Sequence, residues 1–369
     1  MDLIDRWPEA DWVLLLAVKE EGMKDPGAIR TGNTKTTFQT STRDTFGQDE
    51  SPETRAESIA GSLLAVIIHE PPPKNLLLKP FGNLYSLLTS RTLVDGGPPM
   101  APGTRLQQEL ILKLLLEGLH TRVKKRSIFT RFRNSFDLDD MKPLFREMGY
   151  KWQDRLNLLV DTTAAEKAWK EMTNNRRRQV RMSFDNGATI INHPTIKQVS
   201  DFYDMLKIHY QTKVKKPLPG KDFFLALHHL ARPEGKQEKG SQSPVHQPAV
   251  RFFLVGHNDQ IIGGSVCVLK NNHSMHEWYA CGLDQEYKKQ RIYPSVLSTW
   301  AAMEFAANNN IPSFDFLGMG RPEVPYGVRD FKKEFGGMSV NHGRFQKINR
   351  RILYTLAEVG YKVLFLFKR

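Results

Sequence analysis

The residues with the clearest capacity for chemistry lie between positions 314 and 337, in the run FDFLGMGRPEVPYGVRDFKKEFGG. Val328, Phe331 and Phe335 recur at helical spacing, which predicts a short helix with one apolar stripe. Lys332 falls off that stripe. A lysine held beside a reacting carbonyl can stabilise the negative charge that develops on its oxygen. The plainer alternative is that Lys332 is an ordinary solvated lysine.

Two clusters of basic residues are candidates for binding an anion. Arg177 and Arg181 are four positions apart in the run NNRRRQVR, so they share one face of a predicted helix. Lys213, Lys215 and Lys216 crowd a turn that precedes a proline. Clustered basic side chains suit phosphate groups, although a solvated, charged helix face has the same composition.

The region 314–337 resembles the corresponding part of the Fem family of aminoacyltransferases (FemA, FemB and FemX). In that family a D-x-x-G strand is followed by a G-x-x-x-F-K-x-x-F-G-G helix. The residues that match are Asp315, Gly318, Gly327, Phe331, Lys332, Phe335, Gly336 and Gly337. Similar stretches occur at 169–190, 209–224 and 278–306, so the resemblance extends over most of residues 60–350.

The resemblance implies an enzyme that transfers an amino acid from aminoacyl-tRNA to an amine of a lipid-linked or nucleotide-linked muropeptide. Lys332 becomes the candidate for stabilising the oxyanion, and Asp315, which is expected on a buried strand, is the second candidate catalytic residue. No general base stands out, so proton removal by the substrate itself is one hypothesis. No cofactor or metal is expected. The candidate substrate-binding residues are Lys213, Lys215, Lys216, Arg177, Arg181, Asp95, Gly97, Tyr326, Arg329 and Phe331.

Residues 94–98, with the sequence VDGGP, resemble the Gly-Gly-Pro turn of the family's first domain. Members that bind the precursor tend to carry an acidic residue just after the Gly-Pro. Here Pro99 and Met100 stand in its place, and the nearest acid is Asp95, before the glycines. This departure leaves the identity of the acceptor open.

The elements expected around these residues repeat in a similar order. Strands are predicted at 62–69, 84–88 and 155–160, and helices at 105–123 and 164–184. A three-strand meander, a helix at 294–308 and single strands in SFDFLG and SVNHGRF follow. This order predicts an α/β (α+β) chain of two tandem GNAT-like domains, each a mixed, mostly antiparallel sheet flanked by helices. We expect an acidic, partly irregular segment at 1–60, a first domain at 61–165 and a second at 166–369. The second contains a polar loop at 231–248 and a closing helix.

The turn before the helix at 294–308 separates this chain from ordinary GNAT acetyltransferases. Those enzymes hold the pyrophosphate of coenzyme A on a glycine-rich loop whose backbone N–H groups approach the ligand. Here the turn reads QRIYPS from Gln290 to Ser295, without glycine, and Pro294 has no N–H. Coenzyme A is therefore disfavoured in the second half, unless this half is simply degenerate.

Net charge and cysteine content indicate what kind of partner the protein binds and in which compartment it works. The 369 residues carry a net charge of +13, yet residues 1–70 hold 7 Lys/Arg against 13 Asp/Glu. The later part is thus strongly basic, as expected for a protein with an anionic partner. Only two cysteines are present, which argues against a disulfide framework and for a reducing compartment.

No run of apolar residues is long enough to span a bilayer, and residues 12–18 are too few. We expect a cytoplasmic protein that could contact the inner face of the membrane. The closing segment, residues 349–369, has an apolar side and basic ends, so it could rest on anionic lipid. Packing on its own domain is the alternative.

Three other functions remain open from the sequence. The first is an N-acyltransferase that uses an acyl thioester to modify a cell-surface polysaccharide or lipid amine. The second is a catalytically silent RNA-binding protein on the same fold, and the third is a membrane-peripheral scaffold.

Overall fold

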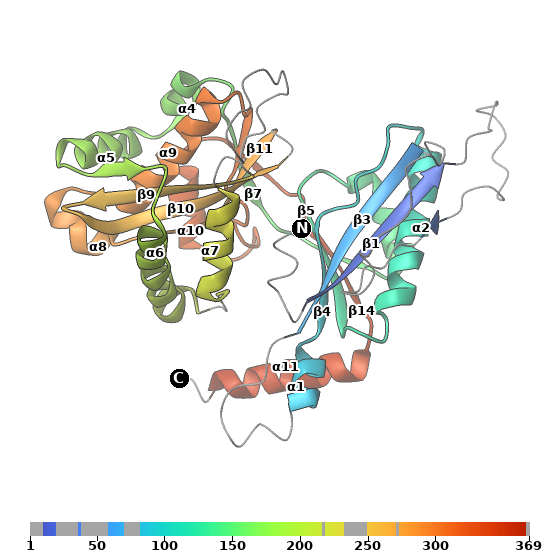
Figure 1. Cartoon of the computed structure of the whole chain (residues 1–369). Helices are drawn as coiled ribbons and strands as arrows, with labels where there is room; N and C mark the ends of the chain where they lie inside the picture. Colours follow the sequence, from blue (N-terminus) through green and yellow to red (C-terminus); the bar gives the residue numbers. More distant parts are fainter. Residues whose placement is uncertain are drawn as a thin grey trace, which may run out of the picture. The chain divides into compact units, whose positions relative to one another are not determined.

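The computed structural model describes residues 10–19, 36–37, 58–69, 82–215, 218–231, 249–270 and 273–366. They divide into two compact units (Figure 1). The described residues between 155 and 341 form the central unit, and those of 7–154 and 342–369 form the flanking unit. In this part of the chain no helix is long and apolar enough to cross a membrane.

The flanking unit is built on one seven-stranded sheet with the order β2-β1-β3-β4-β5-β14-β6. Strands β4 and β5 run parallel, and the other neighbouring pairs are antiparallel. The strands are β1 Ala10–Lys19, β2 Thr36–Thr37, β3 Ser58–Ile68, β4 Arg91–Gly96, β5 Phe129–Asn134, β6 Lys151–Gln153 and β14 Arg344–Ile348. The helices are α1 Gly82–Thr89, α2 Arg105–Val123, α3 Lys142–Glu147 and α11 Arg351–Leu366, with a 3₁₀ turn at Asp139–Met141.

The leucines of α2 form the centre of this unit's core. Leu112, Leu116 and Leu119 are fully buried, and α2 packs on strands β1 and β3. A capping box at Thr104 begins the helix, because its hydroxyl accepts from the Gln107 N–H while the Gln107 side chain accepts from the Thr104 N–H. Helix α2 thereby connects β4 to the parallel strand β5.

One expectation for the amino-terminal part was wrong. Residues 84–88 are not a strand but belong to α1, and Leu84, Leu87 and Leu88 in fact show helical spacing. Strand β1 lies inside the segment 1–60 that was expected to be partly irregular. It pairs along its length with β3, for example Trp12 with Val66, so the apolar run 12–18 is part of a sheet.

The carboxyl-terminal segment also differs from the expectation. SVNHGRF is not one strand: β13 Met338–Val340 joins the central sheet, whereas β14 lies between β5 and β6. The chain turns between them at Gly343, which has φ of +58° and leaves no room for a Cβ beside the Trp152 ring. Residues 342–366 therefore belong with the flanking unit and not with a second domain that continues to 369.

The central unit is a second seven-stranded sheet with the order β13-β7-β12-β11-β10-β9-β8. Strands β11 and β12 run parallel and the other neighbours are antiparallel. Its remaining strands are β7 Asn157–Asp161, β8 Thr189–Ile191, β9 Val250–His257, β10 Gln260–Lys270, β11 Ser274–Gly282 and β12 Ser313–Asp315.

Helices cover both faces of the central sheet (Figure 1). Helix α9, Pro294–Asn308, packs on β9, β10 and β11 and connects β11 to the parallel strand β12. Both units therefore contain a β-α-β crossover of the same form. Helices α6, Ile196–His209, and α7, Lys221–Leu230, contribute to a separate apolar cluster with β9 and β10. The short helices are α8 Asp284–Tyr287 and α10 Gly327–Lys333, with a 3₁₀ turn at Lys288–Gln290 and a π-helical turn at Tyr210–Val214.

The helix expected at 164–184 is two helices, α4 Ala165–Glu171 and α5 Asn174–Asp185. The break occurs at Met172, whose backbone is extended, and at Thr173, whose hydroxyl accepts from the Arg176 N–H. Such a side chain satisfies one of the free N–H groups at a helix start. The cap therefore begins α5 as a helix separate from α4.

Candidate active site

Lys332 lies in α10, and its side chain reaches the carboxyl end of β12. Its Nζ donates to the carbonyl oxygens of Phe316 at 2.7 Å and Gly318 at 3.2 Å, with Leu317 O at 3.5 Å. An ammonium group has three donors, so this one is directed at three consecutive carbonyls. The geometry shows that Lys332 is not a solvated surface lysine.

Two carboxylates influence the charge on Lys332. Burial lowers the pKa of its ammonium group, and the carboxylates of Glu277 and Asp315 counteract part of that effect. A half-buried cation placed beside a reacting carbonyl can stabilise a developing oxyanion. The environment therefore suits the role proposed for Lys332.

Glu277 was not predicted from the sequence. It lies in β11 and is 8 % exposed, and its Oε1 accepts a hydrogen bond of 2.9 Å from the Thr299 hydroxyl of α9. Burial raises the pKa of the Glu277 carboxyl, whereas Lys332 and the hydrogen bond from Thr299 lower it. The signal was present: Glu277 follows the buried Met275 by two residues, so strand alternation places it inward.

Asp315 is buried at the end of β12 and is held by polar partners. The Asn157 amide donates to both carboxylate oxygens at 3.1 and 3.3 Å, and the Leu317 N–H donates to Oδ1 at 2.7 Å. These bonds fix the turn whose carbonyls receive Lys332. Asp315 thus orders the site, and nothing in its contacts marks it as a base.

His276 is a second residue that sequence reasoning missed. In the register of the parallel pair it lies beside Asp315. Burial lowers the pKa of His276, Asp315 raises it and Lys270 lowers it further. A histidine with a lowered pKa is neutral at physiological pH and can accept a proton.

Arg329 shapes the loop that leads into α10. Its guanidinium donates to the carbonyl oxygens of Met319, Pro322 and Val324 at 3.1 Å each, and also to that of Arg321. This role is structural. It differs from the substrate contact expected for Arg329, because these four backbone acceptors already engage the guanidinium.

Tyr326 and Phe331 flank this loop. Tyr326 is 38 % exposed, and its ring packs close to Gly320, which has φ of +80°. Phe331 is half-buried and lies under the guanidinium of Arg176, with 4.4 Å between the Cζ atom and the ring centroid. Of the two, Tyr326 is the one whose exposure suits a substrate contact.

The arginines of α5 act mainly within the fold. Arg177 donates to the Lys170 carbonyl at 2.7 Å and to Asn174, and Arg181 lies over the Trp169 ring. The buried arginine is Arg176, which forms an ion pair of 3.5 Å with Glu334 just after α10. The shared face of Arg177 and Arg181 therefore meets α4.

Lys213 and Lys215 are exposed, as a ligand for an external anion must be. They lie at the π-helical turn after α6, where Lys215 has φ of +53°. Lys216 lies outside the described residues. Burial, followed by Cys281 and Tyr326, raises the pKa of Tyr210 at the start of this turn. An influence of Tyr326 on Tyr210 is consistent with the basic turn and the Tyr326 loop lying in the same part of the central unit.

The turn before α9 has no free N–H group to offer a pyrophosphate among residues 291–295. Arg291 and Ile292 donate to the carbonyls of Lys288 and Tyr287. Tyr293 N–H donates to the Ser183 hydroxyl at 2.9 Å, and Ser295 N–H donates to the Asp284 carboxylate at 3.1 Å. Asp284 puts a negative charge where coenzyme A would need an anion site.

Asp95 and Gly97 belong to the flanking unit. Asp95 forms an exposed ion pair of 3.5 Å with Arg133. Gly97 has φ of +77°, and a Cβ there would press on the Phe136 ring. Glycine at this position is thus explained by the turn itself.

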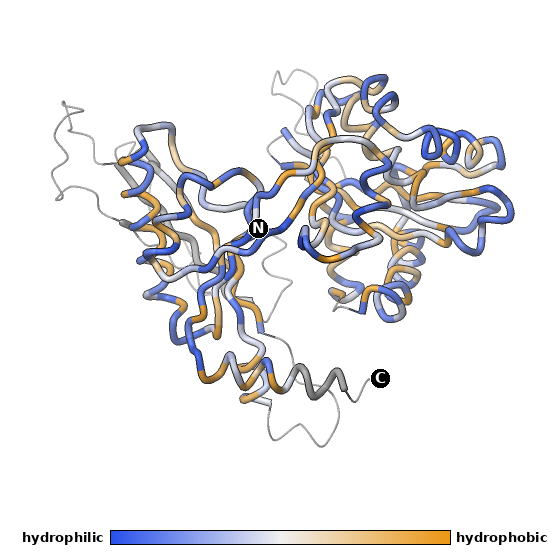
Figure 2. Tube along the Cα trace, turned by 180° about the vertical axis from the view of Figure 1, so that it is seen from behind, coloured by the Kyte–Doolittle hydropathy of each residue, from blue (hydrophilic) through white to orange (hydrophobic). Residues whose placement is uncertain are grey.

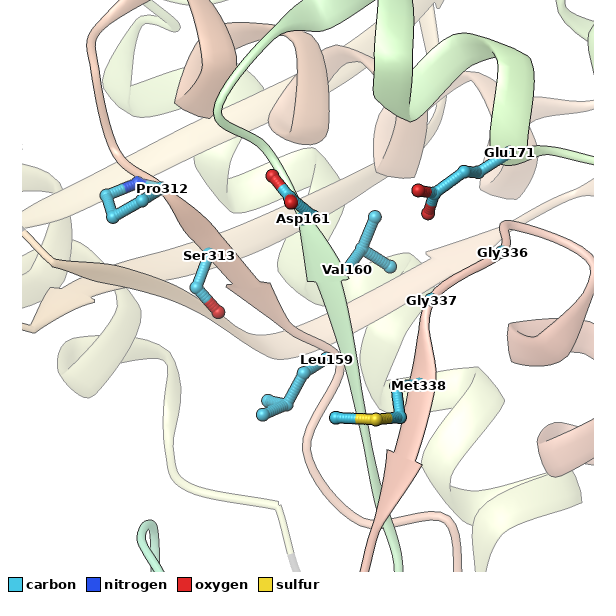
Figure 3. Close-up of a pocket in the computed structure, with 9 residues that line it drawn as sticks. All are labelled: Leu159, Val160, Asp161, Glu171, Pro312, Ser313, Gly336, Gly337 and Met338. Atoms are coloured by element: carbon cyan, nitrogen blue, oxygen red, sulfur yellow. The ribbon is translucent and has the colours of Figure 1, made fainter.

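An open hollow of about 690 Å³ lies along β7, β12 and β13 (Figure 3). The carboxylates that line it are those of Asp161 and Glu171, and Ser313 and Met338 also line it. Hydrogen bonds from Lys167 and Thr163 lower the pKa of Asp161 to about 2. Ser313 is at the opposite end of β12 from the carbonyls that bind Lys332, so we assign the hollow no part in the chemistry. Among the described residues no three His, Cys, Asp or Glu side chains gather to hold a metal.

Comparison with known proteins shows what part of the chain is similar to a known family. Residues 233–362 match the model of the FemAB family. The structure is similar to that of FemX, with a TM-score of 0.57 and 12 % identity over 82 % of this chain and 88 % of that one. No curated protein matches the sequence.

Two other solved structures match with lower TM-scores. L-PGS from Bacillus licheniformis has a TM-score of 0.47 and 11 % identity, covering 80 % of this chain and 85 % of that one. A GCN5-related N-acetyltransferase from Kribbella flavida has a TM-score of 0.31 and 8 % identity, covering 81 % and 60 %.

The fold consists of two mixed, mostly antiparallel sheets flanked by helices, as expected, and it is similar to that of FemX. The match of residues 233–362 to the FemAB family model confirms the resemblance drawn from the sequence. Lys332, Glu277 and the turn before α9 all lie inside the matched segment.

Proposed function

We propose that the protein is a Fem-type aminoacyltransferase, which moves an amino acid from aminoacyl-tRNA to an amine of a lipid-linked or nucleotide-linked peptidoglycan precursor. The observation that carries this proposal is the Lys332 ammonium, held against the carbonyls of Phe316, Leu317 and Gly318. A group that already binds carbonyl oxygen can exchange one of these partners for the carbonyl oxygen of the ester.

The reaction needs one bond to form and one to break. The acceptor amine attacks the carbonyl carbon of the aminoacyl ester, and the resulting oxyanion is stabilised by Lys332. The carbon–oxygen bond to the tRNA ribose then breaks. The amine's proton passes to the departing ribose oxygen, directly or through His276, which burial keeps neutral.

The turn before α9 bears on which acyl donor the protein uses. Its backbone donors are engaged by Ser183, Asp284 and two carbonyls, so the pyrophosphate of an acyl-CoA finds no free N–H at residues 291–295. This supports a tRNA donor over the acyl-thioester alternative. The exposed Lys213 and Lys215 are the residues we propose for phosphate of the donor or acceptor.

A donor comparison by mass spectrometry tests the proposal. The purified protein is incubated with lipid-linked muropeptide and either a mixture of aminoacyl-tRNAs or acetyl-CoA, and the acceptor is weighed. A gain of one amino-acid residue, seen only with charged tRNA, is the expected result. A gain of an acetyl group would instead assign the protein to the thioester class.

A further inference from the structure

Helix α11 carries two apolar faces, and its own domain covers only one of them. The covered face contains Leu353, Tyr354 and Ala357, which are half-buried. Tyr354 packs edge-on against Phe129 of β5, with 5.9 Å between the ring centroids, and its hydroxyl is 3.3 Å from the Gln346 amide. The helix is thus firmly placed at the end of the sheet where β5 begins (Figure 1).

The second face is exposed. Ile352, Leu356 and Val359 are 79 %, 52 % and 54 % exposed, and their spacing of i, i+4 and i+7 forms a single stripe. In sequence the same spacing continues at Val363 and Leu366. Figure 2 shows this apolar colouring on the described part of the helix. We call Ile352, Leu356 and Val359 the α11 stripe.

In sequence, the segment that contains the stripe is mostly positively charged. Arg351 is exposed at the start of the helix, and Lys362 follows within it. Glu358 is the one acidic residue between positions 349 and 369, against Arg350, Arg351, Lys362, Lys368 and Arg369. An aliphatic stripe beside a cationic flank is the composition of helices that lie in the interface of an anionic bilayer.

We propose that the α11 stripe docks the flanking unit on an anionic membrane surface, with Ile352, Leu356 and Val359 inserted between the lipids and the basic residues at the headgroups. A bilayer fits better than a second copy of the chain. Two copies joined through this stripe would bring cationic flanks together, whereas anionic headgroups neutralise them. The inference stands apart from the proposed acyl transfer, because Lys332, Glu277 and the turn before α9 all lie in the central unit.

Sedimentation of the full-length protein with vesicles tests this proposal. One set of vesicles contains phosphatidylcholine alone, and the other contains phosphatidylcholine with phosphatidylglycerol. The wild-type protein should sediment with the second set and much less with the first, and added salt should weaken binding. Ile352→Glu should lower the affinity about tenfold or more, because burying an isoleucine side chain contributes roughly that factor.

Ile208→Glu is the matched control, because Ile208 is 62 % exposed on α6 of the central unit. It should bind vesicles as the wild type does. Ile352→Leu should retain binding, which separates loss of the apolar stripe from loss of the fold. Equal binding of Ile352→Glu and wild type would overturn the proposal, as would a lack of wild-type binding to anionic vesicles. A lipid-independent dimer that Ile352→Glu dissociates would assign the stripe to a second copy instead.

Discussion

The Nζ atom of Lys332 lies 2.7 Å from the carbonyl oxygen of Phe316, and this contact joins helix α10 to the end of strand β12. The carbonyls of Leu317 and Gly318 complete the set of acceptors. Asp315 fixes the turn that presents these carbonyls, because its carboxylate accepts hydrogen bonds from the Asn157 amide and from the Leu317 N–H. The ammonium is therefore held at one place by backbone carbonyl oxygens.

Replacing this ammonium should abolish most of the activity. Lys332→Met removes the cation but keeps the length of the side chain, so transfer should slow by about 10²-fold to 10³-fold, the usual effect of losing one oxyanion donor. Single-turnover kinetics with saturating aminoacyl-tRNA measure this step. Lys333→Met is the matched control, because Lys333 is exposed at the next position and should tolerate the change. Unchanged turnover in Lys332→Met would remove Lys332 from the mechanism.

Glu277 should act on the reaction through Lys332 as a positioning residue. The charged groups that bear on the pKa of Lys332 are Glu277 from β11 and Asp315 from β12, and both favour the cation. Glu277→Gln removes one of them, so the pKa of Lys332 should fall further. The alkaline limb of the pH–rate profile should then move to lower pH, while KM for the acceptor changes little.

Two variants separate this effect from a structural one. Thr299→Val removes the hydrogen bond to Glu277 but leaves its charge, so the alkaline limb should stay closer to the wild-type position. Glu304→Gln changes an exposed acid of α9 and should leave the profile unaltered. An alkaline limb that does not move in Glu277→Gln would show that Glu277 only fills space.

Arg329 should be irreplaceable by lysine. Its planar guanidinium reaches four backbone carbonyls of the loop, a pattern that one ammonium cannot reproduce. Arg329→Lys should loosen residues 319–326, which limited proteolysis would detect as faster cleavage there, and transfer should slow. Arg321→Lys, at an exposed position of the same loop, is the control. Cleavage at the wild-type rate would refute the structural role.

The motif residues could be read from the sequence, but their surroundings could not. The helix with Lys332 was predicted because Phe331 and Phe335 follow helical periodicity and the glycines end it. The partners of Lys332 lie 14 to 16 positions earlier in the chain, at a strand end. Glu277 comes from another strand altogether, and only the sheet order brings it near. Local pattern indicates which residues form an element, whereas strand order decides which side chains meet.

The boundary between the two units also could not be predicted from local sequence pattern. SVNHGRF has the composition of one strand, yet Gly343 turns the chain and its two ends pair in different sheets. Pairing of β14 with β5 spans more than 200 positions, as in Phe345 with Phe132. Arg177 and Arg181 were expected to face a phosphate because they share a helix face. The break at Thr173 directs that face toward α4 instead.

The stability of the central unit should depend on pH through His276. Burial lowers the pKa of His276 in the folded protein below the value of about 6.5 expected when unfolded. Asp315 from β12 opposes this shift and Lys270 from β10 reinforces it. The unfolded chain therefore binds the proton more readily, and the free energy of unfolding should fall as the pH drops below 6.5.

Urea titrations between pH 7.5 and 5 measure this dependence. His276→Gln cannot be protonated, so its slope with pH should be shallower than that of the wild type. His209 on α6 of the same unit, whose pKa is also lowered by burial, should contribute to the slope that remains. His229→Gln, at an exposed position of α7, is the control and should keep the wild-type slope. An unaltered slope in His276→Gln would mean that His276 is protonated equally in both states.

Asp284 should stabilise the start of α9. Its carboxylate accepts from the Ser295 N–H at 3.1 Å and the Ser295 hydroxyl at 2.5 Å, which satisfies a free N–H group at the helix start. Asp284→Ala should lower the free energy of unfolding by about 1 kcal/mol, the usual effect of losing such a cap. Glu286→Ala, an exposed acid in the same short helix, should change the free energy of unfolding little.

Titration of Asp284→Ala with acetyl-CoA in a calorimeter tests whether the Asp284 carboxylate alone keeps coenzyme A from binding. Pro294 still supplies no N–H and Ser183 still engages Tyr293, so no binding is expected. Binding of acetyl-CoA to this variant would show that the carboxylate alone blocks a thioester site.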